Sequence, residues 1–182
     1  MISVIGGAFK GRRLQMVLSP LVRPMPAKLK EALFNISVVR DKVRGAAVLD
    51  GFAGTGSIGI EALSRGADTA TFIEEFYPAI KTIKVNLERC GAEDKGRVIH
   101  REFNRAVIDL GKEKTAFDLI FLDPPYRLLD ERNPLKVIKK RSILKNKGII
   151  VLRHFFKTAP NMTFFDLFRA VTIGDDTLSF FR

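Results

Sequence analysis

The chain has 182 residues, of which 46% are hydrophobic, and a net charge of +11 at pH 7. This length and composition support one globular domain with a small extension. No apolar stretch is long enough to span a bilayer, and the N-terminus lacks the basic segment and apolar core of a signal peptide. We therefore expect a cytoplasmic protein. The single cysteine, Cys90, excludes an internal disulfide and fits a small buried position on a helix.

The basic side chains are concentrated in two segments. Residues 1–44 contain nine Lys and Arg against two acidic residues, and residues 132–165 contain nine basic residues and no acidic one. Residues 45–131 contain eleven basic and fifteen acidic residues. This asymmetry favours a catalytic core flanked by surfaces that bind a polyanion; a solvated basic surface is the simpler alternative. We predict a basic N-terminal extension (residues 1–44) and a catalytic domain (residues 45–182).

Helix-like and strand-like patterns alternate along most of the chain. The glycine-punctuated residues 2–16 indicate a β-hairpin or arm, and residues 27–38 have apolar side chains at helical spacing. The further predicted helices are residues 57–64, 79–90, 104–110 and 134–140, and the predicted strands are residues 46–51, 69–74, 98–100, 117–122, 148–152, 167–173 and 177–182. The last two strands are joined by a hairpin signal, Gly174-Asp175-Asp176. The order predicts an α/β fold: a doubly wound, mostly parallel seven-stranded sheet, Rossmann-like, with an antiparallel C-terminal hairpin and a small N-terminal hairpin and helix extension.

A glycine-rich loop follows the first strand of this alternation and leads into a helix. Gly54, Gly56 and Gly59 form a G-x-G-x-x-G pattern, which lets a ligand approach the backbone at a helix N-terminus. Glu74 ends the next strand, where ribose hydroxyl groups would need an acceptor. NAD and S-adenosylmethionine both satisfy these features, and a tight turn without a ligand is the structural alternative. The residues predicted to bind a cofactor are Asp50, Phe52, Ala53, Gly54, Gly56 and Glu74.

Asp123-Pro124-Pro125-Tyr126 directly follows the apolar run of residues 117–122. Pro124 lacks an N–H, so the strand must end at Asp123, at the edge where open α/β sheets hold their ligands. A carboxylate and a prolyl carbonyl can both accept from an exocyclic amine, and a Tyr ring can stack on the base that carries it. A hydride-transfer enzyme has no use for this corner, so the motif favours a nucleobase amino-methyltransferase. The predicted catalytic residues are Asp123, Pro124 and Tyr126.

With these motifs the chain resembles, over nearly its whole length, the RsmD family of small-subunit ribosomal RNA guanine-N2 methyltransferases. The matching segments are residues 5–14, 23–24, 30–36, 52–67 and 123–126. The resemblance implies a class I methyltransferase fold, S-adenosylmethionine as donor and a guanine of 16S rRNA as acceptor. It also makes Glu102 a candidate contact to the cofactor's adenine. The chain departs from the family pattern at Met25, Gly51 and Arg153, the last at a strand end where an acidic residue is more usual.

Basic residues outside the alternating core are candidates for RNA binding. They are Lys10, Arg12, Arg13, Arg23, Lys28 and Lys30 in the extension, and Arg127 and Arg132 after the catalytic motif. Lys136, Lys139 and Lys140 share one predicted helix face, and we expect them to hold RNA that flanks the target base.

The expected partner is 16S rRNA, free or within a small-subunit particle, and the protein is expected to act as a monomer. No metal is expected, because methyl transfer from a sulfonium needs none. Two alternatives are an adenine-N6 DNA methyltransferase and a catalytically silent RNA-binding or assembly protein. The chain has no separate domain for reading a DNA sequence, which counts against the first alternative.

Overall fold

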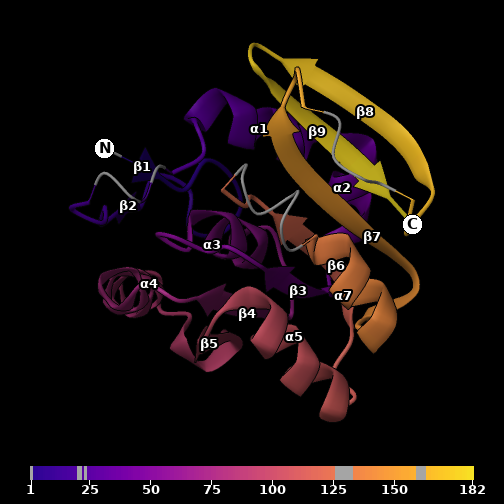
Figure 1. Ribbon diagram of the computed structural model, residues 1–182. Coiled ribbons are helices and arrows are strands. Elements are labelled where there is room, and N and C mark those ends of the chain that lie inside the picture. The colour runs from indigo at the N-terminus through magenta and orange to yellow at the C-terminus, as the bar shows by residue number, and fades with distance from the viewer. Residues whose placement is uncertain (1, 20–21, 23, 126–132, 159–162) are drawn as a thin grey trace.

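The computed structural model describes residues 2–19, 22, 24–125, 133–158 and 163–182 (Figure 1). The chain opens with a short hairpin and two helices: β1 (Ile2–Ser3), β2 (Arg13–Leu14), α1 (Ala27–Asn35) and α2 (Ser37–Lys42). Alternating elements follow: β3 (Ala47–Asp50), α3 (Ser57–Ser64), β4 (Thr69–Glu74), α4 (Tyr77–Cys90), a 3-10 turn (Glu93–Lys95), β5 (Gly96–His100), α5 (Phe103–Lys112) and β6 (Phe117–Leu122). The last elements are α7 (Pro134–Arg141), β7 (Leu144–Phe155), β8 (Leu167–Ile173) and β9 (Asp176–Phe181).

Seven strands form one sheet in the order β5-β4-β3-β6-β7-β9-β8. The strands from β5 to β7 are parallel, whereas β9 pairs antiparallel with both β7 and β8. The chain moves outward from β3 to β5 and then returns to place β6 on the other side of β3. The strand order therefore reverses between β3 and β6, where Asp50 pairs with Phe121. In open α/β sheets, ligands bind beyond the carboxyl ends of the strands at such a reversal.

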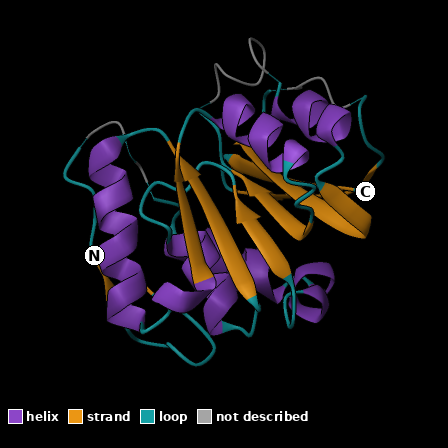
Figure 2. Ribbon diagram, turned by 90° about the horizontal axis from the view of Figure 1, so that it is seen from below, coloured by secondary structure: helices purple, strands orange, loops and turns teal. Residues whose placement is uncertain are grey.

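Helices cover both faces of the sheet (Figure 2). On one face, α1 to α4 and the N-terminal hairpin pack on the sheet through one hydrophobic cluster that includes Val4, Leu33, Ile60, Phe72 and Ile83. On the other face, α5 and α7 pack through a second cluster that includes Leu49, Val107, Ile120 and Ile138. The N-terminal extension therefore shares a core with the sheet. None of the helices in the described residues is long and apolar enough to cross a membrane.

The predicted fold class is confirmed, several element ends differ by one or two residues, and two elements differ more strongly from their predictions. The single helix predicted over residues 27–38 is wrong, because Ile36 adopts an extended conformation (ψ 125°) and separates α1 from α2. The break leaves Val39 fully buried in the core. β7 begins at Leu144 rather than at residue 148, because Leu144 already pairs with Phe117. A shift in the strand register separates this pair from the next one, Leu119–Ile149. The polar residues 145–147 gave no apolar pattern from which this start could be predicted.

Candidate active site

The glycine loop lies between β3 and α3, at the reversal of strand order. Gly54 and Gly56 have positive φ angles of 53° and 76°, a conformation that side chains disfavour. Gly56 caps the N-terminus of α3. Gly51 packs so closely that an added Cβ would lie 2.7 Å from the Phe103 ring. Glycine at these positions therefore shapes a loop whose backbone opens towards the carboxyl edge of the sheet.

Glu74 holds the glycine loop from the end of β4. Its Oε2 accepts from Gly54 N (2.8 Å), and its Oε1 accepts from Glu75 N and Phe76 N (both 2.9 Å). The half-buried carboxylate keeps acceptor capacity on Oε2, because a carboxylate oxygen can accept more than one hydrogen bond. Glu74 thus combines a structural role in the loop with the position at which a ribose acceptor is predicted.

Asp50, the last residue of β3, and Thr55, in the glycine loop, are buried polar residues. Asp50 Oδ2 accepts from Gly59 N (3.0 Å). Burial raises the pKa of Asp50 to about 7, and the negative charges of Asp123 and Glu74 act in the same direction. The Thr55 hydroxyl is buried and has no hydrogen-bond partner among the described residues. Such an unsatisfied group is unusual in a folded protein and calls for an explanation.

Glu102 and two aromatic rings lie beside this loop. Glu102 caps α5, its Oε2 accepting from Arg105 N (3.0 Å). The rings of Phe52 and Phe103 stack with centroids 4.7 Å apart, so the residue after Glu102 packs directly on the glycine loop. The contact of Glu102 with an adenine stays a prediction.

Asp123 and Pro124 follow β6 directly, next to the carboxyl end of β3. Pro124 is buried, whereas the Asp123 side chain is 17% exposed. Asp123 Oδ2 accepts from Arg153 Nη1 (2.9 Å), and Arg153 Nε donates to Asp176 Oδ1 (2.9 Å). Burial raises the pKa of Asp123, and the adjacent Arg153 opposes that shift. The predicted residues Tyr126, Arg127, Arg132 and Arg23 lie outside the described residues.

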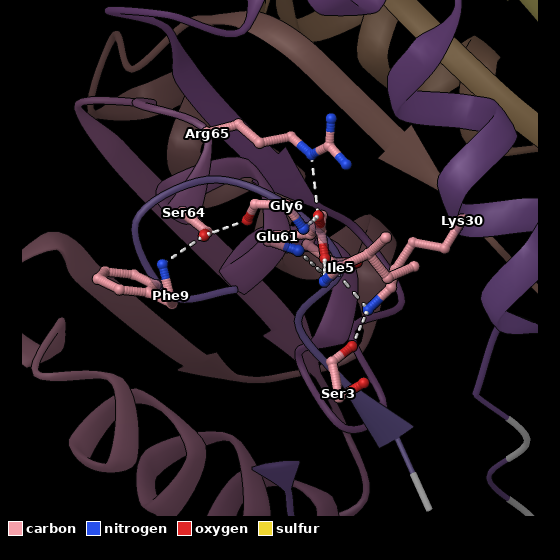
Figure 3. A network of polar contacts seen from close by, with 10 residues as sticks. Ser3, Ile5, Gly6, Phe9, Lys30, Glu61, Ser64 and Arg65 are labelled. Carbon is pink, nitrogen blue, oxygen red and sulfur yellow. Dashed lines mark hydrogen bonds and ion pairs between the residues drawn. The ribbon is translucent and has the colours of Figure 1, made fainter. Parts of the chain in front are cut away.

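The N-terminal arm (residues 2–16) is fixed to α3 by Glu61, which is fully buried (Figure 3). The Glu61 carboxylate accepts from the backbone N–H groups of Ile5 and Gly6 (both 2.8 Å) and from Arg65 Nε (2.9 Å). Ser64 accepts from Phe9 N (2.8 Å) and so fixes the far side of the same turn. The arm is thus held next to α3, the helix that begins after the glycine loop.

Lys30 belongs to this buried network. Its Nζ lies 3.4 Å from Glu61 Oε2 and donates to Ser3 O (3.0 Å), and the residue is 2% exposed. Burial lowers the pKa of Lys30, while Glu61 acts in the opposite direction. The prediction that Lys30 contacts RNA is therefore wrong for this structure, because the side chain is enclosed by the arm and α3. The other described members of the set, Lys10, Arg12, Arg13 and Lys28, are exposed, as RNA contacts must be.

The second basic segment lines a cavity of about 500 Å³ at the start of β7. Its lining residues include Lys139, Lys145, Lys147, Phe165 and Arg182. Lys139 Nζ lies 4.9 Å from the centroid of the Phe165 ring. Leu144, which also lines the cavity, pairs with Phe117 at the start of β6, whereas Asp123 follows the end of β6. Six residues of strand separate these points by about 20 Å. Lys139 therefore lies at the far end of β6 from Asp123, and its contact with RNA that flanks the target base stays a prediction.

Three residues of the site were not identified from the sequence as functional. In the sequence, Arg153 stands out only as a departure from a family pattern, and neither Thr55 nor Glu61 belongs to a motif that assigns it a role of its own. An acidic residue inside the otherwise apolar segment Ile58-Gly59-Ile60-Glu61-Ala62-Leu63 is the signal that could have revealed Glu61, since buried carboxylates are rare unless they are paired.

Comparison with known proteins places this geometry in a family. A family model described as conserved hypothetical protein 95 matches residues 2–182. The "Putative rRNA methyltransferase YlbH" of Bacillus subtilis is 40% identical over 152 residues, which cover 83% of this chain and 81% of that protein. The "Ribosomal RNA small subunit methyltransferase D" of Haemophilus influenzae is 33% identical over 154 residues, covering 82% of this chain and 76% of that protein.

A solved structure of a hypothetical protein from Thermus thermophilus superimposes with a TM-score of 0.84 at 26% identity, covering 99% of this chain and 98% of that one. The family model spans nearly the whole chain, and two of the relatives exceed 30% identity over most of their length. The chain therefore belongs to the conserved hypothetical protein 95 family, which is the RsmD family of methyltransferases that its sequence motifs resemble.

Proposed function

We propose that the protein transfers a methyl group from S-adenosylmethionine to the exocyclic N2 of a guanine in 16S rRNA. The observation that carries this proposal is the placement of the Asp123-Pro124 corner beside the glycine loop, across the reversal of strand order. The family relatives named as small-subunit rRNA methyltransferases support rRNA as the substrate class.

The residues around the glycine loop fit a nucleoside cofactor. Gly54 and Gly56 expose backbone at a helix N-terminus, Glu74 keeps an acceptor at the end of the next strand, and the buried Thr55 hydroxyl lacks a partner among the described residues. The set that would hold S-adenosylmethionine is Asp50, Phe52, Ala53, Gly54, Gly56, Glu74 and Glu102. When bound, this cofactor supplies an electrophilic methyl group on a sulfonium, so that no metal is needed.

Asp123 and Pro124 address the acceptor base. The exocyclic nitrogen of guanine is a weak nucleophile, because its lone pair is delocalised into the ring. A carboxylate oxygen of Asp123 and the carbonyl of Pro124 can each accept a hydrogen bond from an N–H of this amine. They would hold the nitrogen pyramidal, which withdraws its lone pair from conjugation and directs it at the methyl group. As the new C–N bond replaces the C–S bond, the nitrogen would release one proton, to Asp123 or to solvent. This is catalysis by orientation and by stabilising the positive charge that develops on nitrogen. Tyr126 would stack on a base taken out of an RNA loop.

RNA is the nucleic acid we propose, with the substrate bound by the exposed basic residues of the arm and by the basic segment after β6. Lys10, Arg12 and Arg13 are exposed on an arm that Glu61 fixes beside α3, so their position relative to the cofactor loop is set by the fold. We propose that the extension of residues 1–44 serves as the RNA-binding part of a monomeric enzyme.

Methyl transfer from tritium-labelled S-adenosylmethionine to naked 16S rRNA, assembled small subunits and duplex DNA tests the proposal. We expect incorporation into 16S rRNA in at least one of its two forms and none into DNA. Incorporation into DNA alone would favour an adenine-N6 DNA methyltransferase. RNA binding without incorporation into any substrate would favour a silent RNA-binding or assembly protein.

A further inference from the structure

Three charged side chains form a row across neighbouring strands at the carboxyl edge of the sheet. Leu122 pairs with Leu152, so the next residues, Asp123 and Arg153, stand side by side. Arg153 and Phe155 lie two residues apart on β7 and share a face, and Phe155 pairs with Asp176 at the start of β9. The register of β6, β7 and β9 therefore aligns the two carboxylates on either side of one guanidinium.

The row is sheltered from water and closely bonded. The side chains of Asp123, Arg153 and Asp176 are 17%, 15% and 16% exposed, and both contacts of the guanidinium measure 2.9 Å. Arg153 also borders a small apolar space with Met25, Phe121 and Leu178. Charge pairs interact more strongly in such surroundings than in water, and a charge left there without a partner is costly.

We propose that Arg153 is a positioning residue for the acceptor amine, because it fixes the orientation and the ionised state of Asp123 while Asp176 fixes Arg153. The proposal deepens the proposed function and rests on it for the role of Asp123. Arg153 Nη1 donates its hydrogen bond to Oδ2 of Asp123 and not to Oδ1. Oδ1 has no partner among the described residues and is the oxygen that would accept from the amine.

The ionisation of Asp123 depends on a small set of neighbours in the described part of the chain. Arg153 faces it from β7, Asp176 from β9, and Asp50 from the end of β3. The positive charge of Arg153 favours the carboxylate, whereas the negative charge of Asp176 disfavours it. Removing Arg153 must therefore raise the pKa of Asp123, and neutralising Asp176 must lower it, provided that Arg153 stays in place.

The test is the titration of the Asp123 carboxyl carbon by ¹³C NMR in the free protein, with Asp123→Asn identifying the resonance. We expect Arg153→Met to raise the midpoint by about one pH unit or more, the usual effect of losing an adjacent opposite charge. Arg153→Lys should raise it less, because the charge remains without the two-pronged geometry. Asp176→Asn should lower it, since Asn can still accept from Arg153 Nε.

If Arg153→Met raises the Asp123 midpoint and Asp176→Asn lowers it, the proposal is supported. A loss of packing alone would not shift the midpoint in opposite directions in the two variants. If Arg153→Met does not fold, the opposite shifts of Arg153→Lys and Asp176→Asn carry the same test. Unchanged midpoints, or shifts of one sign in all variants, would overturn it. Because this readout needs no substrate, the proposed function can fail separately, through absence of methyl transfer by the wild-type protein.

Parallel activity measurements connect the titration to catalysis. We expect the acidic limb of kcat/KM for RNA to move in the same direction as the Asp123 midpoint in each variant. Affinity for S-adenosylmethionine should stay unchanged, because Arg153 bonds Asp123 and no residue of the glycine loop. A fall in kcat/KM without movement of the acidic limb would reduce Arg153 to a structural residue.

Discussion

At the scale of single residues, Asp123 must meet two opposing requirements. In its proposed role it has to be partly buried to hold an amine in fixed geometry, and burial raises its pKa and favours the neutral acid. The neighbouring guanidinium of Arg153 offsets this cost with an ion pair of 2.9 Å. Asp50, which is fully enclosed, has only the Gly59 N–H to stabilise its charge among the described residues, and its pKa rises to about 7.

The raised pKa of Asp50 should make the free energy of unfolding depend on pH. Its carboxyl holds a proton more tightly in the folded chain (pKa about 7) than in the unfolded chain (about 3.9). Folding stability from this group is therefore full at low pH and falls as the pH rises towards 7, by at most about 1.4 kcal/mol per pH unit. In Asp50→Asn this loss should be absent, because Asn does not titrate, and its amide oxygen can still accept from Gly59 N. Denaturant unfolding of both proteins from pH 4 to pH 8 measures the difference, and a constant difference would contradict the assignment.

We expect Glu74 to contribute to the affinity for S-adenosylmethionine. Glu74→Ala should weaken binding of S-adenosylmethionine by about 1–3 kcal/mol, because it removes a charged acceptor and the support of Gly54 N–H. Glu75→Ala is the matched control: it removes the same charge from the neighbouring exposed position and should leave the affinity unchanged. Isothermal calorimetry measures both. Equal affinity in Glu74→Ala and wild type, or tighter binding of NAD than of S-adenosylmethionine, would refute the cofactor assignment.

At the scale of elements, the N-terminal arm is a fixed part of the enzyme. Glu61 bonds the arm backbone from α3, and Asn86 bonds both Gln15 of the arm and Thr55 of the glycine loop from α4. Gly7 has a φ of 78°, and an added Cβ would collide with the Ser64 carbonyl oxygen. These contacts fix the arm against α3 and α4. Phe9 bonds Ser64 and Arg12 bonds Arg89, so this charged part of the arm lies by the C-terminal ends of the two helices.

We expect the exposed charges of the arm to contribute a salt-dependent part of the affinity for RNA. The double variant Lys10→Gln/Arg13→Gln should raise KM for RNA and reduce the slope of log Kd against log salt by about 0.7–0.9 for each phosphate that is no longer neutralised. Arg12 is left in place because it donates to Arg89 O (2.7 Å) and so has a structural role. Lys112→Gln/Lys114→Gln removes two exposed charges from α5 and the turn after it and serves as the control. Equal RNA affinity of the two double variants at low salt would count against the arm.

We expect Lys139 of α7 to contact RNA at a distance from the target base. Lys139→Gln should weaken binding of long rRNA fragments but not of short oligonucleotides, because its cavity lies about 20 Å from Asp123 along β6. Lys139 and Lys140 stand in the last turn of α7, where the helix dipole offsets their mutual repulsion, so replacing Lys136, Lys139 and Lys140 by Gln should change stability by less than about 1 kcal/mol. Filter binding and thermal unfolding measure the two effects. A large loss of stability with unchanged RNA affinity would make the cluster structural.

At the scale of the whole molecule, the features predicted correctly are those encoded in short segments. The apolar runs of β4 and β6, the glycine loop and Asp123-Pro124 could each be located from a few adjacent residues. The break at Ile36 could not, because it depends on how α1 and α2 pack on the sheet. The ion pairs Arg153–Asp123 and Lys30–Glu61 join residues 30 and 31 positions apart, so only the folded chain brings them together.

Methylated-nucleoside analysis of 16S rRNA tests the central claim most directly. Unmodified 16S rRNA and small subunits are incubated with the protein and S-adenosylmethionine, digested to nucleosides and analysed by mass spectrometry. We predict N2-methylguanosine as the new product, formed about 10²-fold or more slowly by Asp123→Ala, the scale expected when one oriented polar group of an active site is lost. Cofactor binding by Asp123→Ala should be unchanged. Methylation at another base or ring position, or near-normal formation of N2-methylguanosine by Asp123→Ala, would contradict the account.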